Sequence, residues 1–288
     1  MEKKAISLIE CPRDAMQGIH EFIPTEKKIK YIQSLLAVGF DTIDFGSFVS
    51  PKAIPQMADT AEVLAGLDLS NTKSKLLAII ANERGAEEAA RHEAIDFLGY
   101  PFSVSETFQM RNTNATIADS LGRIEKIQNI AVQSNKKLVV YLSMGFGNPY
   151  GDEWSLEIVA NWSEKLHLNF GIDILALSDT VGVADPSTIK ALFSSLIPAL
   201  PSVEFGAHLH ANPASFEGKL RAAYEAGCRR FDGAIKGYGG CPMAKDDLTG
   251  NMPTELMIDW FHRNDIHTNI NLEAFAEAMS IANNTFPL

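Results

Sequence analysis

Two histidines, His208 and His210, end an apolar run in the segment VEFGAHLHA. Successive side chains of a β-strand point to opposite faces, so a His-x-His pair directs both imidazoles to the same side. Neutral imidazole is the commonest metal ligand among protein side chains. The pair therefore predicts part of a metal site. The alternative is that two polar residues share a strand end and bind nothing.

The elements that must position this pair alternate along the chain. Short apolar runs are followed by longer segments in which apolar residues recur at helical spacing, as Ile117, Leu121 and Ile124 do. Near-continuous apolar runs are typical of strands that are covered on both faces. The expected strands are residues 5–10, 42–48, 76–81, 94–100, 138–143, 172–178, 203–208 and 230–235.

Eight strand–helix units predict an α/β fold, a (β/α)8 TIM barrel. Residues 271–283 lie outside the eightfold pattern and predict an additional C-terminal helix. Because no Gly-, Ser- or Pro-rich linker divides the chain, we expect residues 1–288 to form a single TIM-barrel catalytic domain. A doubly wound open sheet is the rival. Its nucleotide-binding forms lose support because the chain has neither GxGxxG after the first strand nor GxxxxGK[ST].

Composition narrows the class of partner. The formal net charge is -11, which disfavours nucleic acid as a partner. No apolar run approaches the roughly 20 residues that span a bilayer, so no membrane partner is expected. The three cysteines have no CxxC spacing, which argues against a disulfide framework or a zinc ribbon and favours a reducing cytoplasm.

Other reactive residues fall where strands are expected to end. In TIM barrels the chemistry sits at the C-terminal ends of the strands. A carboxylate, two imidazoles and an amide oxygen form a mixed set that suits Mg²⁺ or Mn²⁺, with zinc as an alternative. The residues at these ends, besides the two histidines, are Arg13, Asp14, Asp44, Ser47, Asp179, Cys241 and Asn251.

Several of these residues also have a purely structural interpretation. Asp14 can cap a turn, and Arg13 can form an internal salt bridge. Asp179 can cap a helix or pair with a cation. Cys241 can be an inert buried thiol, although the preceding Gly239-Gly240 and following Pro242 favour a shaped loop that closes as a lid.

Ordered motifs along the chain point to a known family. They read PRDAMQ, GSFVSPKAIPQMAD, SDTVGV, HLH, GGCP and a later GN. With these motifs the chain resembles 3-hydroxy-3-methylglutaryl-CoA lyase and the wider DRE-TIM metallolyase superfamily over nearly its whole length. The resemblance implies that a divalent metal is bound by Asp14, His208, His210 and Asn251. It also implies an acyl-CoA substrate, no redox cofactor and a homodimer.

The resemblance further implies the reaction and the other roles. A branched 3-hydroxyacyl-CoA would be cleaved by retro-aldol-type chemistry to acetyl-CoA and acetoacetate. Arg13 would stabilise the enolate oxygen, Cys241 would move a proton, and Asp179 would assist proton transfer from the hydroxyl. Asp44 would join the catalytic set. Gln17 and Ser47 would contact the substrate.

The chain departs from the family pattern at several points. Asp44 stands where the family carries Glu, HLHANPAS replaces HxHDTYG, and the spacing from Cys241 to Asn251 is one residue longer. Three alternatives therefore remain. They are an aldolase or condensing enzyme acting on another hydroxy or oxo acid, a non-catalytic metal-binding barrel, and a glycosidase with Asp14 and Asp44 as its carboxylates.

Overall fold

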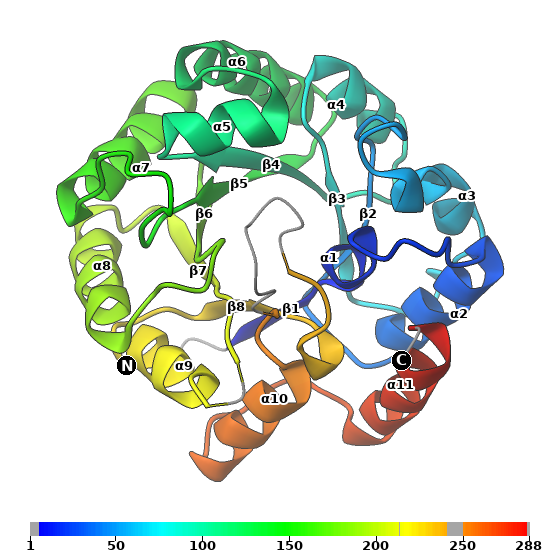
Figure 1. Ribbon diagram of the computed structural model, residues 1–288. Helices are drawn as coiled ribbons and strands as arrows, with labels where there is room; N and C mark the ends of the chain where they lie inside the picture. Colours follow the sequence, from blue (N-terminus) through cyan, green and yellow to red (C-terminus); the bar gives the residue numbers. More distant parts are fainter. Residues whose placement is uncertain (1–5, 213, 241–249, 287–288) are drawn as a thin grey trace.

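The computed structural model describes residues 6–212, 214–240 and 250–286. Eight parallel strands close into a barrel in chain order, and β8 pairs with β1. Helices surround the barrel on the outside (Figure 1). The predicted TIM barrel is confirmed. The strands are β1 (Ser7–Glu10), β2 (Thr42–Ser47), β3 (Lys75–Ile79), β4 (Phe97–Ser103), β5 (Lys137–Ser143), β6 (Ile174–Ser178), β7 (Glu204–His208) and β8 (Arg230–Gly233).

The predicted extra C-terminal helix is present as α11 and packs against α2, the first long helix of the ring (Figure 1). Within the described ranges, no helix is both long enough and apolar enough to cross a membrane. The helices are α1 (Pro12–Gln17), α2 (Thr25–Leu36), α3 (Thr60–Ala65), α4 (Glu83–Ala90), α5 (Glu106–Thr113), α6 (Ile117–Gln133), α7 (Leu156–Phe170), α8 (Pro186–Ala199), α9 (Phe216–Glu225), α10 (Thr254–Arg263) and α11 (Leu272–Thr285), with 3-10 turns η1 (Pro55–Met57) and η2 (Ile235–Gly237).

A short helix, α1, directly follows β1, where the sequence predicted only a strand exit. Pro12 occupies its first turn, where the missing N–H costs nothing and the fixed φ suits a helix. Residues three and four positions apart share one face of a helix. Arg13, Asp14 and Gln17 are therefore presented together at the mouth of the barrel.

Strand β4 begins three residues later than predicted and runs through Pro101 to Ser103. A proline normally ends a central strand because it cannot donate to the ladder. Pairing of β3 with β4 stops at Gly99, so Pro101 lies beyond that ladder while its own pairing with β5 continues opposite Tyr141. The missing N–H of Pro101 therefore removes no hydrogen bond between β3 and β4.

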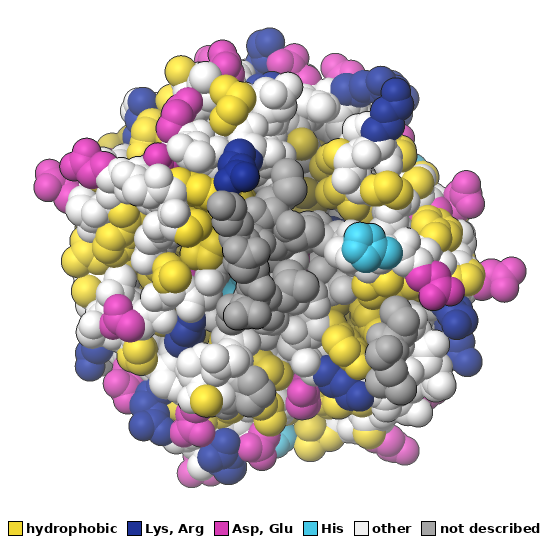
Figure 2. All heavy atoms as spheres, viewed as in Figure 1, with side chains coloured by type: hydrophobic (Ala, Val, Ile, Leu, Met, Phe, Trp, Pro, Cys, Tyr) yellow, Lys and Arg dark blue, Asp and Glu magenta, His cyan; other side chains and the backbone are white. Residues whose placement is uncertain are grey.

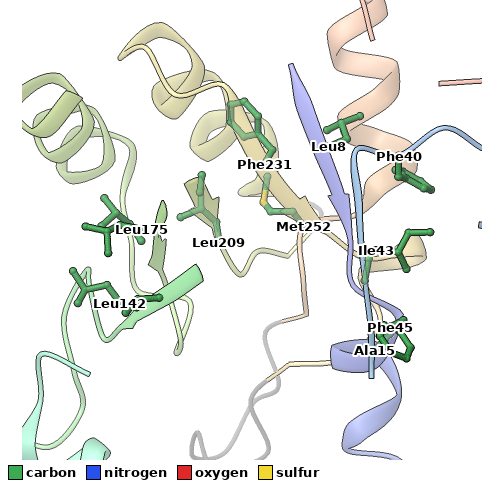
Figure 3. Packing of buried hydrophobic residues seen from close by; sticks show 14 of the residues in the cluster. Leu8, Ala15, Phe40, Ile43, Phe45, Leu142, Leu175, Leu209, Phe231 and Met252 are labelled. Carbon is green, nitrogen blue, oxygen red and sulfur yellow. The ribbon is translucent and has the colours of Figure 1, made fainter. Parts of the chain in front are cut away.

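The core has an inner and an outer layer. Val139 and Tyr141 of β5 point into the barrel with the small inner cluster. Val140 and Leu142 belong to the larger cluster between the strands and the helices, of which Figure 3 shows a part that includes Leu142. Period-two alternation along a buried strand produces this division. The strands are thus fixed on both faces, and their C-terminal ends form a rigid frame for the site.

Candidate metal centre

A cavity of about 790 Å³, including space open to solvent, lies at the C-terminal ends of the strands. Figure 2 shows this end of the barrel, with most charged side chains toward the rim. Five predicted site residues, Arg13, Asp14, Gln17, His208 and His210, line the cavity. Its apolar walls are formed by residues that include Val49, Ile54, Ile79, Ala81, Pro101, Phe108 and Tyr141.

Three of the four predicted metal ligands meet in this cavity. Three potential ligand atoms, one each from Asp14, His208 and His210, lie within 4.8 Å of one another. Asp14 and His210 are buried, and the side chain of His208 is 11% exposed. Asn251 is the fourth. Its Nδ2 donates to Asp14 Oδ2 at 2.7 Å, and its backbone forms a bridge with that of His210. The fold thus brings together two residues that are 237 positions apart in the chain.

The imidazole of His210 fits a metal ligand. Its Nε2 is buried and has no hydrogen-bond partner among the described residues. Burial, together with neighbouring His208, lowers the pKa of His210 to about 4, while Asp14 opposes the shift. At neutral pH the ring is therefore uncharged, which is the form that binds a cation. An unpaired buried nitrogen costs free energy unless something binds it.

The imidazole of His208 is oriented by Asp232, a residue that the sequence analysis missed. Nδ1 lies 3.1 Å from Asp232 Oδ2, and the ring packs edge-to-face with Tyr141 at a centroid distance of 5.3 Å. Burial works to lower the pKa of His208, but Asp232 outweighs it and raises the pKa. The signal in the sequence was an aspartate inside the short strand β8.

A second group of potential ligand atoms comprises Cys11, His208 and Asp232, again within 4.8 Å of one another. Burial raises the pKa of the Cys11 thiol well above its usual value, and nearby Asp232 and Asp44 raise it further. Because the thiolate is the metal-binding form, this group is a poor site. The carboxylate of Asp232 instead serves the histidine.

Arg13 is held between two carboxylates. Its Nε lies 3.1 Å from Asp44 Oδ2, and its Nη1 donates to Asp14 Oδ1 at 2.8 Å. Burial raises the pKa of Asp44 to about 6, although Arg13 acts against the rise. Burial also acts to raise the pKa of Asp14, but Arg13 and the two histidines outweigh it and lower the pKa. Asp14 therefore stays ionised beside the cavity.

The two predicted substrate-binding residues are placed differently. Gln17 lines the cavity, and its Nε2 donates to Asp14 Oδ1 at 2.7 Å. Ser47 is buried behind the wall, where its Oγ accepts from the N–H of Val49 at 3.2 Å and its N–H donates to Thr60 Oγ1. Val49 lines the cavity instead. Direct contact of Ser47 with a substrate stays a prediction.

Asp179 pairs with a cation, one of the two structural alternatives considered for it. Lys219 Nζ lies 2.6 Å from Asp179 Oδ2, and both side chains are buried. Ser178 and Thr180 line the cavity on either side, but Asp179 is not among the lining residues. Burial raises the pKa of Asp179, and Lys219 opposes the rise. Its assistance in proton transfer stays a prediction.

Cys241 lies outside the described residues, so its predicted proton transfer stays a prediction. Of the two glycines before it, Gly239 has a φ of +89° and packs directly on α1. A Cβ at Gly239 would lie 2.5 Å from the backbone oxygen of Asp14. Glycine, which has no Cβ, permits this close backbone approach. The start of this loop thus contacts the predicted metal ligand.

The family model described as HMGL-like matches residues 6–281 of the chain. The chain belongs to the HMGL-like family. Hydroxymethylglutaryl-CoA lyase of Bacillus subtilis is 34% identical over 270 residues, which cover 93% of this chain and 88% of the relative. A 3-hydroxy-3-isohexenylglutaryl-CoA/hydroxymethylglutaryl-CoA lyase of Pseudomonas aeruginosa is 32% identical over 276 residues, which cover 96% of this chain and 91% of the relative.

Solved structures agree with this membership. An HMG-CoA lyase from Acinetobacter baumannii, in complex with coenzyme A and 3-methylmalate, matches this HMGL-like chain with a TM-score of 0.88 and 32% identity. The match covers 97% of this chain and 91% of that chain. The resemblance that the motifs indicated is therefore confirmed.

Proposed function

We propose that this chain is a divalent-metal-dependent carbon–carbon lyase. It cleaves 3-hydroxy-3-methylglutaryl-CoA, or a similar branched 3-hydroxyacyl-CoA, to acetyl-CoA and acetoacetate or its analogue. The convergence of Asp14, His208 and His210 beside Arg13 in one cavity, with Asn251 donating to Asp14, carries the proposal. Lyase relatives across nearly the whole chain support it.

The four residues would hold a divalent cation. The buried, unpartnered Nε2 of His210 and the ionised carboxylate of Asp14 support this assignment. When bound, the cation would act as a Lewis acid and template for the hydroxyl and carbonyl oxygens of the substrate. The mixed oxygen and nitrogen donor set favours Mg²⁺ or Mn²⁺, with zinc as the alternative.

Arg13 would provide much of the electrostatic stabilisation of the reaction. In the cleavage, the bond between the hydroxyl-bearing carbon and the carbon next to the thioester breaks, and its electron pair becomes a thioester enolate. The hydroxyl loses its proton, and the enolate carbon later takes one to give acetyl-CoA. A guanidinium held rigidly by Asp44 and Asp14 can stabilise the developing oxyanion without reorganising. Asp44 would thus act mainly by aiming Arg13.

A second cavity offers a path for the thioester arm. It encloses about 1110 Å³, including space open to solvent, and shares Gln17, Val49, Ile54 and Asn112 with the metal cavity. Its further walls include Ile19, Phe22, Ala53 and Pro55. A mostly apolar groove leading outward suits a pantetheine chain. The relative that was solved with coenzyme A supports an acyl-CoA substrate.

The cavity walls bear on the size of the alkyl branch at the hydroxyl-bearing carbon of the substrate. Ile79, Ala81, Pro101 and Phe108 give the metal cavity an apolar wall. One relative is named for a substrate with an isohexenyl branch as well as for the methyl one. We therefore propose that the substrate panel should include branches longer than methyl.

The experiment is acetyl-CoA release by the purified protein after metal removal and reconstitution with Mg²⁺, Mn²⁺ or Zn²⁺. We expect turnover of at least one 3-hydroxy-3-alkylglutaryl-CoA with metal present and a loss of at least about 10³-fold for His210→Ala. An absence of turnover with every such thioester would refute the substrate assignment. If the protein binds metal but turns over neither these thioesters nor CoA-free hydroxy acids, the result would favour the non-catalytic barrel.

The predicted homodimer and cytoplasmic location stay proposals. Light scattering of the purified protein tests the first, and fractionation of the source cells tests the second.

A further inference from the structure

A lysine and an aspartate form a buried ion pair directly behind the two histidines. Lys219 belongs to α9, and Asp179 follows β6. Their side chains are 4% and 0% exposed, and Nζ lies 2.6 Å from Oδ2. Lysine is almost never fully buried unless its charge is paired. A pair at this depth needs a structural or functional reason, because its desolvation is costly.

The ammonium of Lys219 has three donors, and the described residues supply three acceptors. Besides Asp179, these are the backbone oxygen of His210 at 2.7 Å and that of Gly182 at 3.1 Å. Lys219 therefore ties the exit of β7 to the turn that follows β6. On the β7 side, the group that accepts from Lys219 is the backbone oxygen of His210, a predicted metal ligand.

Asp179 reinforces the same connection. Its backbone N–H donates to the backbone oxygen of His208 at 3.0 Å. Its second carboxylate oxygen, Oδ1, accepts from the N–H of Ala184 at 3.0 Å and closes the turn. Both carboxylate oxygens thus have protein donors. The pair of Lys219 and Asp179 contacts the backbone of both histidines, one through each residue.

We infer that Lys219 is a positioning residue of the metal centre and that Asp179 serves as its counter-ion. The inference rests on the proposed metal lyase function. Lys219 fixes the carbonyl of His210 and so the direction of an imidazole whose Nε2 has no other described partner. Residues that orient metal ligands typically change affinity by about 10–100-fold when removed. Asp179, occupied at both oxygens, holds the lysine side chain in place.

Two variants separate positioning from simple charge balance. Lys219→Met removes the bond to His210 but leaves Asp179 as an uncompensated buried charge, so it should lose both stability and Mn²⁺ affinity. Lys219→Met combined with Asp179→Asn removes both charges, and such replacements are often neutral for stability. We expect this double variant to regain thermal stability while its Mn²⁺ affinity stays about 10–100-fold weaker than wild type.

Mn²⁺ is titrated into the protein without substrate, and the free ion is measured by electron paramagnetic resonance. Thermal unfolding of the same variants gives their stability. Lys190→Met is the matched control, because Lys190 is an exposed lysine on α8 that faces Glu225 at 3.7 Å. It should bind Mn²⁺ as wild type does. Wild-type Mn²⁺ affinity in the folded double variant would overturn the inference and leave the proposed function intact. Failure of the wild-type protein to bind Mn²⁺ would overturn both.

Discussion

The buried carboxyl group of Glu10 is expected to make the stability of the protein depend on pH. It ends β1 fully buried, and its two oxygens accept from the N–H of Ile235 and, at 2.6 Å, from the hydroxyl of Thr254. These two residues flank the segment that carries Asn251. Glu10 therefore anchors both ends of the loop that completes the predicted metal set.

Burial raises the pKa of Glu10 from 4.5 to about 8, although both hydrogen bonds act to lower it. The folded protein then holds a proton that the unfolded chain releases above about pH 4.5. The stability due to this group is fully present below that pH and is lost as pH rises through about 8. Between about pH 5.5 and about pH 9, the loss in unfolding free energy from Glu10 is about 3 kcal/mol.

Glu10→Gln removes the titration and keeps the shape, since the amide oxygen can accept from Ile235 and the amide nitrogen can donate to Thr254. We expect the variant to gain about 3 kcal/mol relative to wild type between about pH 5.5 and about pH 9, measured by urea unfolding. Glu87→Gln, at an exposed position of α4, is the control and should show no such pH-dependent gain. A constant difference between wild type and Glu10→Gln across this range would refute the reasoning.

Three further predictions concern the site. Asp232→Asn removes the carboxylate that orients His208, so Mn²⁺ affinity should fall about 10–100-fold by titration, and an unchanged affinity would contradict the assigned role. Gly239→Ala places a Cβ 2.5 Å from the backbone oxygen of Asp14 and should weaken Mn²⁺ binding, whereas Gly18→Ala meets nothing within 4 Å and should not. If ionised Asp44, with a pKa of about 6, aims Arg13, then kcat/KM should fall as pH drops through about 6. Asp44→Asn should abolish this acid limb and lower kcat/KM throughout, and a persisting limb would assign it to another group.

The strand–helix alternation was readable because burial on both faces leaves near-continuous apolar runs. Two local details were not. Pro101 continues β4 because β3 has already ended beside it, which depends on the register between strands and not on the residue itself. The helix α1 is only six residues long, and its apolar spacing is too short to distinguish from a turn.

The sequence by itself determined the fold class and the family and predicted the metal-ligand types, because periodicity and motif order are properties of one chain read locally. Only the tertiary structure decided which charges meet. Asp232 and Lys219 looked like ordinary charged residues of a strand and a helix, yet the packing of neighbouring strands and helices places one against His208 and the other against Asp179 and His210. Contacts of this kind depend on distances between separate strands and helices, and residue spacing within one segment carries no information about them.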